Sequence, residues 1–437
     1  MPSPGLVPDV ANFSFHVSVW DEASLGQHQS MLSTLRNAAG YRYLVVVGTA
    51  VVCYAALGTV LGILPGYVHS LGGGAVLVGF AVGAPALTGA AGRPVGGRIA
   101  DRIGPARVVI AGALFMALGT IPAYVHSLAC LIVSRLAVGA GEAAMMAATV
   151  LWLLRLAGPE RRGRAMGHIG LANYAGLTVG PPLSVALAGE SHPERVWIAA
   201  AVLPLLAAAF AAVTARGGEE AAQVGASQEE PERSGEFAQS AFRSTLRPGL
   251  GLMLVNFGYV ALLSFGAAAA MEQGSGVAKF VIPVFGVGVI ASRTIFAGIP
   301  DRFGAARTLL GAVVLEALGL AALAVATSAP AALVALVVLS LGQGLAVPSL
   351  GLLALASVPP SRHGRTAGAF FAYFDAGVGL GGPAAGLAAR AADPTGALFA
   401  AAVAVLAAAP VALVRGSKGL AARRRRHHAG SRCDAVS

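Results

Sequence analysis

The sequence predicts an all-α membrane protein in which twelve transmembrane helices form two related six-helix bundles. The first observation is composition: 56% of the 437 residues are hydrophobic and 11% are charged, whereas a soluble domain carries about 25% charged residues. The second is that twelve apolar runs are long enough to cross a bilayer. The third is a short charged phrase that occurs twice, 200 residues apart, and indicates two related halves.

The twelve runs divide into two sets of six, separated by a polar stretch. The first bundle is expected over 42–215, with spans at 43–68, 75–97, 106–126, 128–154, 164–188 and 195–215. The second is expected over 248–415, with spans at 248–271, 277–299, 305–327, 330–355, 364–389 and 394–415. Between them, 216–247 is rich in Glu, Gly, Ser and Gln, which is typical of a flexible linker.

Positive charge falls almost entirely on one side of this predicted topology. When loops are assigned to alternate sides, one side receives 24 of the 30 Lys and Arg residues, and the other receives Arg195, Lys279 and Arg390. By the positive-inside rule both termini and the linker are cytoplasmic, as expected for a multi-pass protein of the plasma (inner) membrane. The net charge of +10 is explained by this bias, so no nucleic-acid partner is expected.

The two ends of the chain lie outside the predicted bundles. Residues 1–41 contain no apolar run of signal-peptide length and are expected to be a disordered cytoplasmic segment, in which Met31 is an alternative start. Residues 416–437 form a basic tail, which favours contact with anionic lipid. The chain is expected to be a monomer.

The repeated phrase lies between the second and third spans of each half. In the first half it contains Gly97, Asp101, Arg102 and Gly104, and in the second Asp301, Arg302 and Gly304. Together with the twelve spans and the cytoplasmic linker, this phrase makes the chain resemble the major facilitator superfamily over about residues 42–415. The resemblance implies a secondary transporter in which these turns gate alternating access. The alternative to gating is that the turns only fix the orientation of the chain in the membrane.

The fourth span contains charges that a membrane helix rarely carries. Arg135, Gly139 and Gly141 match the family's helix-4 pattern, and Glu142 follows seven residues after Arg135 on the same stripe of the helix. Such residues are expensive in a bilayer unless they face a partner or a wet cavity. The pattern favours proton coupling or substrate binding, with a buried structural pair as the alternative.

The fifth span resembles the helix-5 signature of the family's exporters. It contains Gly167, Gly176, Gly180 and Pro181, although the expected Gly-Gly ending is replaced by other residues. These glycines predict close helix packing and the proline a bend. Ordinary packing of a glycine-rich chain is the alternative to an export role.

The second half repeats this glycine spacing at +201, with Asp375 at the position equivalent to Tyr174. Asp375 is far from either helix end and is the second candidate for proton coupling or substrate contact. Glu316 is expected to be structural, because the family's helix 9 lies outside the central cavity. Candidate cavity residues on other spans are Tyr54, Asn173, Tyr174, Asn256, Tyr259, Gln343, Phe370 and Phe374.

Several function classes are disfavoured by what the sequence lacks. It has no phosphate-binding loop that ends in Lys and Ser or Thr, so direct use of ATP is not expected. Its three cysteines have no metal-site or disulfide spacing, and no nucleophile–base set is apparent, so neither a cofactor nor an enzymatic activity is predicted. The expected function is proton-driven export of a small organic compound. An uptake carrier for a sugar or organic anion, and a membrane sensor or scaffold, are the alternatives.

Overall fold

The computed structural model describes residues 38–158, 161–188, 192–216, 234–356, 358 and 363–413. Every regular element in these ranges is helical, as the sequence predicts. The predicted N-terminal segment before Ala38, residues 217–233 of the linker and the basic tail lie outside the described residues.

The first half follows the predicted order of spans. Its helices are α2 (Ala38–Leu61), α3 (Leu64–Ser70), α4 (Ala75–Ile103), α5 (Pro105–Gly119), the 3-10 helix η1 (Ile121–Tyr124), α6 (Leu128–Ala157), α7 (Arg162–Ala188) and α8 (Pro193–Arg216). The short α3 was predicted as the end of the first span. It is separate because Pro65, in its first turn, has no backbone N–H to continue the preceding helix.

The second half repeats this plan. Its helices are α9 (Ser234–Glu272), the 3-10 helix η4 (Ala278–Phe280), α10 (Val281–Ile295), α11 (Ile299–Phe303), α12 (Ala305–Val325), α13 (Ala329–Leu355) and α14 (His363–Leu413). Helix α9 begins inside the segment predicted as a linker. The eighth predicted span, 277–299, contains η4 and α10, which ends at Ile295. The short α11 follows after a break, with Pro300 in its first turn.

Ten helices within the described ranges are long and apolar enough to cross a membrane. One of them, α14, has non-helical backbone angles at Ala392 and Asp393 and therefore consists of two successive helices. Helix α7 is not among the ten, although it has 27 residues, because glycines and the pair Pro181–Pro182 dilute its apolar content. Counting α14 twice and including α7 would give twelve spans, so that number stays a prediction.

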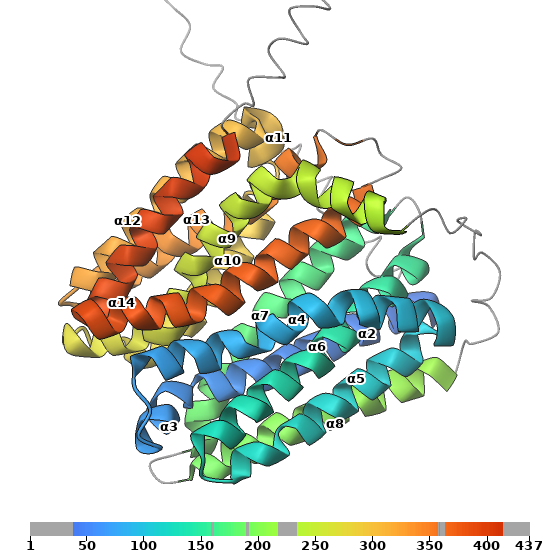
Figure 1. Cartoon of the computed structure of the whole chain (residues 1–437), viewed down its shortest axis with the longest axis horizontal. Coiled ribbons are helices and arrows are strands. Elements are labelled where there is room, and N and C mark those ends of the chain that lie inside the picture. The colour runs from blue at the N-terminus through green and yellow to red at the C-terminus, as the bar shows by residue number, and fades with distance from the viewer. Residues whose placement is uncertain are drawn as a thin grey trace, which may run out of the picture.

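The two halves meet mainly through two pairs of helices. Figure 1 shows the blue-to-green first half beside the yellow-to-red second half, with α4 and α14 side by side at the boundary. The second pair is α7 with α10. At an offset of about 200 residues α4 corresponds to α10, and α7 corresponds to the first segment of α14. The two pairs are therefore equivalent, and the boundary has approximate two-fold symmetry.

Glycines make the α4–α14 contact very close. A Cβ on Gly79 would lie 2.0 Å from the carbonyl oxygen of Gly382, and one on Gly386 would lie 2.6 Å from that of Ala75. Only glycine permits backbones to approach this closely. These residues lie toward the end of the bundle remote from Ala38 and Leu413, so the halves are packed together at that end.

Candidate functional site

Arg93 on α4 connects two buried carboxylates at the boundary between the halves. Its Nε lies 2.7 Å from Oδ2 of Asp375 on α14, and its Nη2 donates a hydrogen bond of 3.0 Å to Oδ1 of the same residue. Nη2 also lies 3.5 Å from Oε1 of Glu142 on α6. Arg93 therefore holds an ion pair across the boundary and a longer one within the first half.

Tyr54 on α2 adds a fourth member to this cluster. Its hydroxyl donates a short hydrogen bond to Oε1 of Glu142, the oxygen that also faces Arg93. Asp375 and Glu142 have 2% and 6% of their side chains exposed, whereas Arg93 has 25% exposed. The carboxylates are thus enclosed, and the arginine remains partly accessible.

Small residues bring the supporting helices together. A Cβ on Gly139 would lie 2.3 Å from the carbonyl oxygen of Pro85, so α6 packs tightly on α4 beside the cluster. Gly89, one turn before Arg93, would place a Cβ 3.5 Å from Oδ2 of Asp375. A larger residue at 89 would compete with Arg93 for the space around that carboxylate.

The cluster holds one fixed positive charge and two acidic groups. With both carboxylates ionised its net charge is negative, and one bound proton would neutralise it. Charges in a membrane interior are costly unless paired. Binding of a proton to one of the carboxylates can therefore change which ion pair Arg93 makes across the boundary.

A second arginine occupies the equivalent position of the second half. Arg293 on α10 lies 200 residues after Arg93 and stacks on the ring of Tyr174 of α7, with its guanidinium carbon 4.7 Å from the ring centre. Tyr174 also contacts Tyr259 at a centroid distance of 6.3 Å. Tyr259 in turn packs against Phe285 and Phe374 at 5.9 and 6.4 Å. This aromatic cluster of Tyr174, Tyr259, Phe285 and Phe374 spans the boundary.

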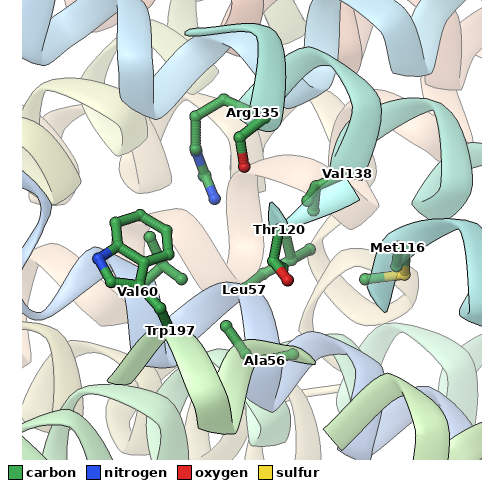
Figure 2. Close-up of a pocket in the computed structure, with 10 residues that line it drawn as sticks. Ala56, Leu57, Val60, Met116, Thr120, Arg135, Val138 and Trp197 are labelled. Carbon is green, nitrogen blue, oxygen red and sulfur yellow. The ribbon is translucent and has the colours of Figure 1, made fainter. Parts of the chain in front are cut away.

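Arg135, expected to act with Glu142, lies elsewhere. It is 3% exposed, and its Nε donates a hydrogen bond of 3.0 Å to the carbonyl oxygen of Ala81. Figure 2 shows its side chain pointing into a small cavity beside Trp197 and Thr120, inside the first half. The cavity measures about 10 Å³, which is room for about one water molecule.

The repeated turns lie at the end of the bundle where α4 meets α5 and α11 meets α12. Gly104 and Gly304 have φ values of +94° and +85°, which residues with a side chain rarely adopt. Asp101 lies 3.6 Å from Arg155 of the same half. Among the residues that the structure describes, no ion pair joins either turn to the opposite half.

The glycines of the export-type signature differ in their surroundings. Gly176 and Gly180 pack against α2: a Cβ on the first would lie 2.4 Å from the carbonyl oxygen of Val51, and one on the second 2.3 Å from the carbonyl carbon of Gly58. Gly167 has open space around it. The signature therefore tightens the α2–α7 contact within the first half, and Pro181 is buried in α7.

The remaining candidates lie mostly within the second half. Gln343 is fully buried, and with its amide nitrogen facing Glu316 it donates hydrogen bonds of 2.8 and 3.3 Å to that carboxylate. Asn256 is also fully buried and donates to the carbonyl oxygen of Leu252. Asn173 is partly buried, and its side-chain oxygen has no hydrogen-bond partner in the described part of the chain. Phe370 packs on Phe371, outside the aromatic cluster.

Arg93 was not among the residues selected from the sequence. One signal could have found it, because Arg93, Arg135 and Arg293 are the three arginines that remain when the other basic residues are assigned to loops and termini. Charged groups at membrane depth are functional candidates by default. All three are buried or partly buried in the structure.

Residues 46–382 match the sequence model of the Major Facilitator Superfamily. The chain belongs to this family. An uncharacterized MFS-type transporter of Burkholderia mallei is 32% identical over 382 residues, which cover 84% of this chain and 90% of the relative. One from Salmonella typhimurium is 30% identical, with 76% of this chain and 86% of the relative covered.

Solved structures of MFS transporters share the fold. The nucleoside transporter NupG superposes with a TM-score of 0.67 at 16% identity, covering 86% of this chain and 100% of that one. A bacterial homologue of the human lysosomal transporter Spinster, in an inward-facing and unoccupied conformation, gives 0.65 at 16% identity, covering 86% and 95%. The protein is thus an MFS transporter of the membrane, and members of this family are not enzymes.

Proposed function

We propose that this MFS transporter exports a small organic compound in exchange for protons, and that Arg93, Glu142 and Asp375 form the coupling site. The observation that carries the proposal is the ion pair of 2.7 Å between Arg93 and Asp375, because it joins the two halves that must separate during alternating access. Opening the boundary at this point breaks the pair.

A proton can replace the arginine as the partner of a carboxylate. When Asp375 takes up a proton, its attraction to Arg93 is lost, and the cost of separating the halves falls. Arg93 then keeps Glu142, whose oxygen also accepts the Tyr54 hydroxyl hydrogen bond. Release of the proton restores the cross-boundary pair, so protonation and conformation are linked.

One feature supports export, and a second gives the site access from one side of the membrane. The spacing of Gly167, Gly176 and Gly180 resembles the signature of the family's exporters. The second is the arrangement of the halves, which pack closely at the end remote from Ala38 and Leu413. With cytoplasmic termini, as the distribution of arginines favours, the partly exposed Arg93 faces the cytoplasm, where an exporter takes up its substrate.

The experiment is an accumulation assay in cells that carry the gene, an empty vector or a coupling-site variant. A panel of labelled drugs, nucleosides, sugars and organic anions is tested with and without a protonophore. We expect lower accumulation of at least one compound, abolished by the protonophore and by Asp375→Asn or Glu142→Gln. Higher accumulation would reverse the direction and favour uptake. Full proton dependence in both variants would remove the coupling assignment.

A further inference from the structure

The two halves repeat one arrangement of residues but give it different charges. In the first arrangement Arg93 meets Asp375 and Glu142. The repeat places Arg293 at +200 from Arg93, and Tyr174 and Gln343 at 201 residues from Asp375 and Glu142. The glycine pairs Gly176–Gly377 and Gly180–Gly381 share the offset of 201. The two positions equivalent to the acidic residues are therefore neutral: Tyr174 contacts Arg293, and Gln343 faces Glu316 instead.

Arg293 has no acidic partner in the described ranges. None of the carboxylates there lies within ion-pair distance of it, and its Nε has no hydrogen-bond partner. The hydroxyl of Tyr174, which is 7% exposed, is likewise unpartnered. An intramembrane arginine without an acidic partner is costly, and such residues commonly face a ligand path.

The surroundings of Arg293 suit a ligand with an apolar body. Its guanidinium lies on Tyr174, and the aromatic cluster continues through Tyr259 to Phe285 and Phe374. Phe374 immediately precedes Asp375, so the cluster adjoins the coupling site along α14. Arginine binds carboxylates through two parallel hydrogen bonds, while aromatic rings cover apolar surface.

We propose that Arg293 and the aromatic cluster bind an amphipathic organic anion, with the guanidinium on its anionic group and the rings on its apolar part. This assigns a substrate class to the transport activity proposed above, on which it rests. The repeat then has two roles: Arg93 is neutralised by the protein's own carboxylates, and Arg293 is neutralised by the substrate.

The test measures ligand stabilisation of the purified full-length protein in detergent by its thermal unfolding midpoint. The probes are three pairs that differ in charge: 1-naphthoate with 1-naphthamide, indole-3-acetate with indole-3-acetamide, and salicylate with salicylamide. We expect at least one acid, and none of the amides, to raise the midpoint of the wild type. In Arg293→Gln the acid should bind about tenfold to a hundredfold more weakly, which is the usual value of charge-assisted hydrogen bonds. Arg293→Lys should fall between them.

Arg390→Gln is the matched control, because Arg390 is exposed near the end of the first segment of α14 and loses the same charge. It should keep the wild-type response. The proposal fails if no acid stabilises the wild type, if the amides act equally, or if Arg293→Gln keeps the response.

A second measurement, the unfolding midpoint of the variants without ligand, also tests the proposal. Replacing Arg293 leaves no carboxylate of the described ranges unpaired, whereas replacing Arg93 leaves the buried Asp375 and Glu142 without their ion pair. Ligand-free Arg293→Gln should therefore unfold near the wild-type midpoint, and Arg93→Gln below it. If Arg293→Gln unfolds as early as Arg93→Gln, Arg293 is structural and the inference is wrong. These measurements use no proton gradient, so a failure of proton coupling in cells is a separate result.

Discussion

At the scale of single residues, Arg93 determines what the coupling site can do. A guanidinium between two carboxylates can satisfy only part of their hydrogen-bonding capacity, and Tyr54 supplies a further donor to Glu142. Asp375, with 2% of its side chain exposed, depends on Arg93 alone for an ion pair in the described part of the chain. Because Asp375 is on the opposite half, its ion pair with Arg93 can form only when the two halves are in contact at this point.

A double-mutant cycle tests this coupling. Arg93→Gln should destabilise the protein by about 3 kcal/mol, because it leaves the buried carboxylate of Asp375 without its ion-pair partner. Asp375→Asn should cost less, about 1–2 kcal/mol, because Arg93 is 25% exposed and keeps Glu142. The double variant should be less destabilised than the sum, with a coupling energy of about 1–2 kcal/mol. Thermal unfolding is measured for the purified wild type, the two single variants and the double variant. Strict additivity would show that the 2.7 Å contact carries no interaction.

Whether sequence reasoning finds a contact depends on how local that contact is. Arg135 and Glu142 were paired because seven residues return to the same face of a helix, but they are also about 10 Å apart along the axis. That is beyond ion-pair distance, and each finds a partner on another helix instead: Ala81 for Arg135, and Tyr54 with Arg93 for Glu142. Which helices become neighbours is not encoded in local spacing.

At the scale of helices, the predictions that succeeded rest on local chemistry. Hydropathy gave the order of the helices and the class of fold, and Gly104 and Gly304 gave the positions of two turns. Short breaks such as that between α10 and α11 were missed because the apolar run continues through them. The close α4–α14 contact was missed too, because Gly79 and Gly382 are two of 58 glycines in the sequence.

The importance of the α4–α14 contact can be tested by substitution. Gly79→Ala would place a methyl group 2.0 Å from the carbonyl oxygen of Gly382, so the helices must move apart. We expect a loss of about 1–3 kcal/mol of stability from overpacking and impaired transport of the compound found in cells. Gly311→Ala on α12 is the control, since nothing lies within 4 Å of the added methyl. It should be neutral or stabilising, because alanine favours helix more than glycine. Equal behaviour of the two variants would contradict the role of the contact.

At the scale of the whole molecule, the halves are closed at the end remote from Ala38 and Leu413, and the pseudo-symmetric pairs α4–α14 and α7–α10 form that closure. Rocking one half against the other must open both pairs to expose the opposite face. The Arg93–Asp375 pair and the Arg293–Tyr174 stack lie one on each of these boundaries. Proton and substrate would thus act on the two helix pairs that must open together, which gives a physical basis for coupling them.

Locking the second boundary should therefore stop transport. On Gly286 of α10 a Cβ would lie 2.9 Å from Cβ of Thr178 on α7, so cysteines at 178 and 286 can form a disulfide after a small shift. In a background without native cysteines, oxidation should abolish transport, and a reductant should restore it. Gly119→Cys with Ala137→Cys is the control, with a Cβ separation of 3.2 Å within one half. That cross-link should leave transport intact, because rigid-body rocking does not change distances inside a half. Normal transport by the oxidised Thr178→Cys/Gly286→Cys protein would mean that the α7–α10 boundary does not open in the cycle.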